Sequence, residues 1–104
     1  MKTIRVAVYR TGMEMAIEEI PAGLESYQEI VGGYIAHVPL MIDDLVLICN
    51  EEGIPLGLSP NRVHRWPNGE TEMIRGDFFV CRVLDDDYAG LTDDDIGRLP
   101  ALIG

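Results

Sequence analysis

A cluster of basic and aromatic side chains, Arg62, His64, Arg65 and Trp66, is the part of this sequence best suited to binding chemistry. Two guanidinium groups can grip a phosphate through paired hydrogen bonds, and an indole can stack on a base or on an arginine. Asparagine amides could add contacts to a base or ribose. We therefore predict a site for a nucleotide-like anion. Its residues are Asn50, Asn61, Arg62, Arg65 and Trp66.

A structural role is the alternative for the same cluster. The arginines would then neutralise neighbouring carboxylates, and Trp66 would cover the edge of the core. The pair Gly32-Gly33 carries a similar ambiguity, because glycines can cradle a phosphate. The pair follows a predicted helix and precedes a predicted strand, the reverse of the order that directs helix amides at an anion. A helix stop is the predicted role.

No residue pattern predicts catalysis or a metal site. Glu51-Glu52 and the aspartate runs are expected in turns, as solvated surface rather than as a paired acid and base. Cys49 and Cys81 lie in apolar segments and are expected to be buried free thiols. Together with His37 and His64 they lack the spacing of metal ligands. We predict a protein that is not an enzyme and needs no cofactor.

The charge balance narrows the class of partner. The formal net charge is −10, and six of the eighteen acidic residues lie in Asp85–Asp87 and Asp93–Asp95. Such a surface repels phosphate backbones, so direct nucleic-acid binding is not expected. It could attract a basic partner, or imitate nucleic acid towards a protein that binds it. Solubility alone is the plainer explanation.

Length and hydropathy predict one cytoplasmic domain spanning residues 1–104. A chain of 104 residues is near the common size for a self-sufficient core. The longest nearly apolar run, Leu45 to Cys49, is too short to cross a bilayer. The N-terminus, Met1 to Arg5, has neither the apolar segment nor the cleavage site of a signal peptide. No membrane association is expected.

The elements that must position these side chains are predicted from hydrophobic periodicity. Alternation over Ile4–Val8 and again over Met13–Glu18 predicts an N-terminal β-hairpin. Leu24–Val31 has helical spacing, and Tyr34–Leu40 returns to strand character. The apolar run Leu45–Cys49 predicts a central strand buried on both faces.

The second half of the chain reads as loop, strand and helix. Ser59–Arg62 is predicted to be a short helical turn or a loop, and Phe78–Leu84 is the last predicted strand. Asp85–Asp87 cannot continue a buried ladder, and Thr92 is expected to cap a short C-terminal helix. The predicted fold class is α+β: a mainly antiparallel sheet with an N-terminal β-hairpin, one helix on a sheet face and a short C-terminal helix.

Several short segments together resemble domain-of-unknown-function family 3846, which is scattered through phages, plasmids and bacterial genomes. They are Glu29–Ile35, Val38–Leu40, Asn50–Gly53, Leu58 with Asn61-Arg62, and Gly76–Val80. The resemblance covers residues 3 to about 99. It implies a fold and a mobile-element context, but no established chemistry.

Context and cluster together suggest a small binding protein that sequesters a nucleotide-like anion to counter host defence. It could act as a homo-dimer whose loops face each other. The alternatives are an acidic, nucleic-acid-mimicking inhibitor of a host protein and an accessory protein-interaction module.

Overall fold

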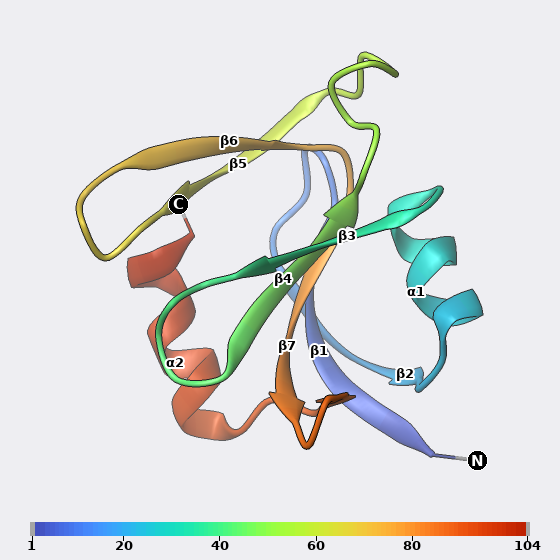
Figure 1. Ribbon diagram of the computed structural model, residues 1–104, viewed down its shortest axis with the longest axis vertical. Helices are drawn as coiled ribbons and strands as arrows, with labels where there is room; N and C mark the ends of the chain where they lie inside the picture. The colour runs from blue at the N-terminus through green and yellow to red at the C-terminus, as the bar shows by residue number, and fades with distance from the viewer. Residues whose placement is uncertain (1, 104) are drawn as a thin grey trace.

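A mainly antiparallel sheet organises this α+β protein, whose computed structural model describes residues 2–103 (Figure 1). Two helices and a separate two-stranded sheet pack against it. In chain order the elements are β1 (Thr3–Tyr9), β2 (Ala16–Pro21), α1 (Leu24–Val31), β3 (Ile35–Pro39), β4 (Leu45–Asn50), β5 (Pro60–Arg65), β6 (Thr71–Arg75), β7 (Phe78–Leu84), β8 (Asp87–Ala89) and α2 (Asp93–Leu102).

The main sheet has the strand order β2-β1-β7-β4-β3, and β8 pairs with the far end of β7. The apolar run that predicts β4 is buried, with Leu47 and Ile48 fully covered. The middle of the sheet is nevertheless β7, whose residues Phe78 to Cys81 are all completely buried. Strands β4 and β7 are therefore covered on both faces, and so is most of β1, where Val6, Ala7 and Val8 are fully buried.

The N-terminal β-hairpin is confirmed, but its second strand begins later than predicted. Ile4 pairs with Ile20 and Val8 with Ala16. The segment before Ala16 forms a turn instead, with Gly12 at φ 75° and the Met13 amide bonded to the Arg10 carbonyl at 3.0 Å. Alternating hydrophobicity alone does not distinguish a strand from the wide loop that precedes it.

Helix α1 covers one face of the sheet. Tyr27 and Val31 are buried in a cluster with Val6, Ile48 and Phe79 from three strands. The helix ends as predicted at Gly32, which takes the left-handed conformation (φ 78°) that a side chain would disfavour.

Helix α2 and the β5–β6 sheet cover the other face. Leu99 of α2 and Ile74 of β6 join a second cluster with Leu47, Phe78 and Val80. As predicted, Thr92 caps α2: its side chain accepts from the Asp95 amide while the Asp95 carboxylate accepts from the Thr92 amide. Such a capping box satisfies amides that have no partner within the helix.

The prediction for Ser59–Arg62 is wrong. It was expected as a helical turn or loop, but Pro60 opens β5, which pairs with β6 through a register shift between Pro60 and Arg62. The aspartates do end the buried ladder, since β7 stops at Leu84 and Asp85 and Asp86 form a tight turn at φ 52° and 63°. The short strand β8, which begins at Asp87, was not predicted. Positive φ at both central residues is the geometry that closes two-residue hairpins.

Candidate functional site

Asn50, the first of the predicted ligand residues, serves the fold. It is 7% exposed, its Nδ2 donates to the Val31 carbonyl at 3.1 Å, and its Oδ1 accepts from the Glu52 amide at 2.7 Å. These bonds join the end of α1 to the turn after β4. A Cβ on Gly33 would lie 3.0 Å from the same Nδ2, so glycine is needed for this close approach. Both polar atoms of the Asn50 side chain are thus engaged within the fold.

Asn61 and Arg62 join the second sheet to the first. The Nδ2 of Asn61 donates to the carbonyls of Tyr9 and Gly76, both at 2.8 Å. Arg62 donates to the Asn61 side chain at 2.7 Å and to the Met13 carbonyl, and its guanidinium lies 5.7 Å from the centre of the Tyr9 ring. The acceptors are carbonyls and an amide rather than the carboxylates of the structural alternative.

Arg65 and Trp66 do not converge with Arg62. Arg62 and Arg65 are three positions apart on β5, and side chains alternate along a strand, so the two guanidinium groups point to opposite faces. Arg65 is exposed, and within residues 2–103 it makes no side-chain hydrogen bond or ion pair. Trp66 is half-buried and packs on the His64 ring at 4.3 Å between centroids. Trp66 thus covers the edge of the core, as the structural alternative expected.

His64 is a buried polar group without a partner. It is 0% exposed, and neither ring nitrogen has a hydrogen-bond partner among the described residues. Burial lowers the pKa of His64, and the nearby Glu72 opposes the shift more weakly. Leaving both ring nitrogens without a hydrogen bond is costly. The neutral imidazole costs less to bury than the protonated one, so His64 is a neutral member of the core.

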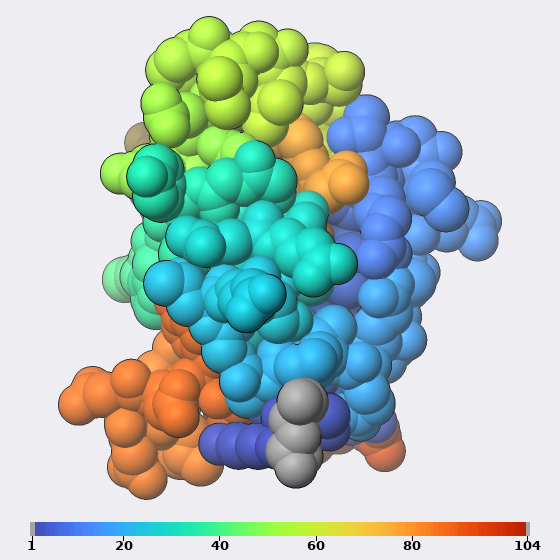
Figure 2. All heavy atoms as spheres, turned by 90° about the vertical axis from the view of Figure 1, so that its right-hand side faces the viewer, coloured from blue at the N-terminus to red at the C-terminus, as the bar shows by residue number. Residues whose placement is uncertain are grey.

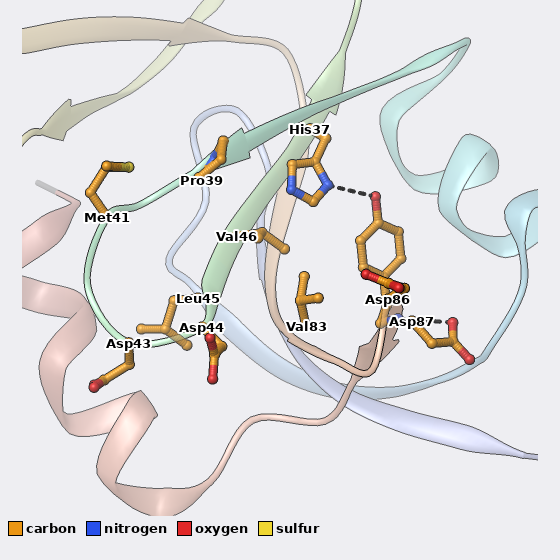
Figure 3. Close-up of a pocket in the computed structure, with 11 residues that line it drawn as sticks. His37, Pro39, Met41, Asp43, Asp44, Leu45, Val46, Val83, Asp86 and Asp87 are labelled. Atoms are coloured by element: carbon orange, nitrogen blue, oxygen red, sulfur yellow. Dashed lines mark hydrogen bonds between the residues drawn. The ribbon is translucent and has the colours of Figure 1, made fainter.

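The most prominent concavity of the described residues lies elsewhere. It is a groove of about 820 Å³ on the same face of the sheet as α1, in the part of that face that the helix leaves uncovered, between β3 and the β7–β8 hairpin (Figure 3). Its apolar lining residues are Pro39, Met41, Leu45, Val46 and Val83. Figure 2 shows the β7–β8 region (orange) projecting from the body of the protein beside this groove.

Four carboxylates surround this apolar floor: Asp43, Asp44, Asp86 and Asp87. Asp43 pairs with Arg98 of α2, and Asp44 lies 3.6 Å from Arg82. Within residues 2–103, neither Asp86 nor Asp87 has an ion-pair partner, and both are exposed. No lysine or arginine of the described chain lines the groove. Its local charge is therefore negative.

A histidine and a tyrosine close one end of the groove. The Nδ1 of His37 and the hydroxyl of Tyr88 share a hydrogen bond of 3.0 Å, and their rings stack with centroids 5.8 Å apart. Tyr88 also packs edge-on against Tyr27 of α1 at 5.3 Å. The pair thus links the exposed strand β3 to the β7–β8 hairpin across the sheet.

Sequence reasoning missed this groove although it noted several of its residues. The aspartate runs were expected in turns, and Asp85–Asp87 also on an acidic surface that could attract a basic partner, but Asp43-Asp44 and Asp85–Asp87 were not expected to lie on one groove. They meet because β4 and β7 pair, with Leu45 opposite Arg82, and the sequence has no local signal for that pairing. The alternation of Tyr34–Leu40 could have placed His37 and Pro39 on one face.

Two features are absent within residues 2–103. No group of three or more His, Cys, Asp or Glu side chains is arranged to hold a metal ion. No helix in this range is long and apolar enough to span a membrane.

Comparison with known proteins gives one match. The family model described as Domain of unknown function (DUF3846) matches residues 4–103, nearly the whole chain. No curated protein and no solved structure matches this chain. The segments that meet around Asn50 and Asn61 are among those that carried the resemblance noted in the sequence. The chain belongs to the DUF3846 family.

Proposed function

We propose that this protein is a non-enzymatic binding module whose acidic groove engages a basic segment of a partner protein. The observation that supports this most directly is the groove itself: an apolar floor rimmed by carboxylates, two of which, Asp86 and Asp87, have no ion-pair partner among the described residues. Apolar surface provides affinity on burial, while the carboxylates select the sign of charge and speed association.

The long-range field acts in the same direction. With a net charge of −10, the protein attracts basic surfaces before contact, and more strongly at low salt. A partner that normally binds nucleic acid presents such a surface, so imitation of nucleic acid is one form of this function. A mobile-element setting, in which the target would be a host protein, is compatible with it and stays a prediction.

The nucleotide-like anion site also stays a prediction, with less support. Arg62 is engaged in bonds to Asn61 and Met13, and Arg65 points to the other face of β5. Of these two arginines, only Arg65 is free of such bonds in the described part of the chain. Calorimetry against mono-, di- and cyclic nucleotides tests this site, and heat that is lost in the Arg62→Ala/Arg65→Ala double variant would restore it as the leading function.

Binding of a labelled, flexible peptide of alternating glycine and arginine tests the proposed function. Asp86→Asn with Asp87→Asn removes two groove charges and should weaken binding about tenfold, since an exposed ion pair contributes up to about 1 kcal/mol. Glu25→Gln with Glu29→Gln is the matched control, because it removes the same charge from exposed positions on α1. The control should change affinity less than about twofold.

Three outcomes separate the alternatives. Loss confined to the groove variant supports the proposal. Equal loss in both variants would mean that net charge alone attracts the peptide. Absence of salt-dependent binding by the unaltered protein would overturn the function.

A further inference from the structure

Strand β3 is an open edge of the main sheet. It pairs with β4 along one side, from Ile35 opposite Asn50 to Pro39 opposite Val46, and no described strand pairs with its other side. In Figure 1, β3 lies in front of β4 at the end of the sheet. An open edge presents unpaired backbone groups to any extended chain.

The register identifies these backbone groups. The Leu40 amide bonds to the Leu45 carbonyl, and the Glu51 amide to the Tyr34 carbonyl, so Tyr34 and Leu40 belong to hydrogen-bonded pairs. Bonding alternates along an antiparallel pair. The N–H groups of Ile35 and His37, and the carbonyls of Ile35, His37 and Pro39, therefore point away from β4. A partner strand would find both donors and acceptors there.

This edge lacks the protection found on the opposite edge of the sheet. Strand β2, the other end of the strand order, carries Glu18 and Glu19. Charged side chains of this kind discourage strand addition. Strand β3 has the sequence Ile-Ala-His-Val-Pro, with no Asp, Glu, Lys or Arg, and Pro39 at its end is its only edge-protecting residue.

The two faces beside β3 differ in character. His37 and Pro39 face the acidic groove. Ala36 and Val38, on the other face, line a smaller cavity of about 260 Å³ shared with Ile54 and Met73, which are 81% and 47% exposed. A strand added to β3 would therefore place alternate side chains against carboxylates and against a mainly apolar surface, whose lining also includes Glu51, Glu72 and Arg75.

Charge decides which occupant fits. A second copy of this chain would bring another net charge of −10 and another acidic groove to the same edge. Like charges at such close range disfavour association. A basic segment is attracted instead, and its alternating apolar residues match the second face.

We infer that β3 adds an extended partner segment of alternating basic and apolar residues as a further strand of the sheet. This rests on the proposed function and specifies its binding mode. Main-chain hydrogen bonds to Ile35, His37 and Pro39 provide affinity, while the groove and the Ile54–Met73 side select the sequence. This is the mode of β-strand addition.

The test uses a short labelled peptide of alternating lysine and valine and the intact protein. One version is N-methylated at every lysine and another at every valine, so that each lacks the amides along one of its edges. In antiparallel addition, each residue of the added strand that bonds to β3 lies directly opposite an outward-bonding residue of β3, and the two side chains point to the same face of the sheet. Lysines that face the acidic groove are therefore the residues whose amides point towards β3. Methylation of the lysines should weaken binding at least tenfold, and methylation of the valines less than twofold.

A pair of protein variants tests the same bonds from the other side. His37→Pro removes the imidazole and the outward N–H and leaves the β4 ladder intact. His37→Ala also removes the imidazole but keeps the N–H, so a difference between the two variants reports on that N–H. Only the proline variant should bind the lysine–valine peptide at least tenfold more weakly than the unaltered protein does. The affinities of the two variants for the flexible glycine–arginine peptide should lie within about twofold of one another.

The outcomes separate this inference from the function on which it rests. If neither peptide binds in a salt-dependent way, the proposed function fails and the inference with it. If the peptides bind but neither methylation pattern nor His37→Pro changes affinity, the function stands and strand addition is overturned. A peptide-free dimer that His37→Pro dissociates would assign the edge to a second copy and also overturn the inference.

Discussion

Asp95 holds α2 on the sheet, and replacing it with asparagine should be among the most damaging near-isosteric changes in this protein. Its carboxylate is 1% exposed and accepts from Arg82 Nη2 at 2.6 Å and from Arg82 Nε at 3.0 Å. It also accepts from the Thr92 amide at 2.9 Å, completing the capping box. One side chain thus links the start of α2 to β7.

The magnitude follows from these contacts. Hydrogen bonds to charged groups contribute about 1.5–3 kcal/mol each, and a helix cap about 1 kcal/mol. An asparagine at this position would turn an N–H₂ group towards one of the donors of Arg82 or Thr92. The Arg82 side chain is 24% exposed, so water takes up part of the loss. We expect Asp95→Asn to lower the free energy of unfolding by about 2–4 kcal/mol, a fall in Tm of roughly 10–25 °C.

The pH dependence gives an independent check. Burial raises the pKa of Asp95, but the hydrogen bonds from Arg82 and Thr92 outweigh it, and the pKa is lowered below the usual 3.8. The stability that Asp95 contributes is therefore complete above pH 3.8 and is lost as pH falls through the folded-state pKa. The difference in unfolding free energy between the unaltered protein and Asp95→Asn should shrink in the same acidic range.

Urea and thermal unfolding, followed by circular dichroism, measure these effects. Asp94→Asn is the control, because Asp94 is exposed in the same helical turn and should cost no more than about 1 kcal/mol through the helix dipole. A double-mutant cycle with Arg82→Met isolates the pair. Additive losses in that cycle, or equal losses for Asp94→Asn and Asp95→Asn, would refute the reasoning.

Three further predictions concern the rest of the fold. Leu47→Ala should lower the free energy of unfolding by about 2–5 kcal/mol, because Leu47 is fully buried between two layers; a shift in the urea midpoint measures it. Burial lowers the pKa of His64, so the unfolded state takes up the proton first and stability should fall as pH drops below about 6.5. His64→Leu should flatten that slope, and an unchanged slope would assign it to another group. Asp86→Gly should raise Tm by a few degrees, since φ 63° costs an L-residue about 1 kcal/mol that glycine does not incur, and a lower Tm would argue against strain in this turn.

The elements that the sequence predicted well are those with a strong local signal. Gly32 ends α1 because a left-handed residue is needed there, and Thr92 begins α2 because its hydroxyl meets an amide three residues on. The buried run of β4 and the first four residues of β7, Phe78 to Cys81, follow from continuous apolar residues. Each of these signals depends on neighbours in the chain, which is why it is visible without the structure.

The candidate site was less predictable because it depends on pairings between distant segments. Arg62 and Arg65 were grouped because they are close in the sequence, in a segment that was not expected to form a strand. On a strand the same spacing separates them. The groove required β4 to pair with β7 and β8 to fold back, which brings Asp44 near Asp87. Local sequence specifies neither event.

The pairing of β1 with β7 has a consequence for synthesis and folding. Ala7 lies beside Val80, so the first strand cannot complete its ladder until β7 has left the ribosome. Until then the β1–β2 hairpin has an uncovered inner edge, and closing the long loop between these strands costs chain entropy before any contact compensates for it. A nascent chain of this design is exposed to mispairing longest at its N-terminal hairpin. On β2, Glu18 is paired with Arg10 of the same hairpin, whereas Glu19 has no ion-pair partner among the described residues and would help to repel other copies while β7 is still being made.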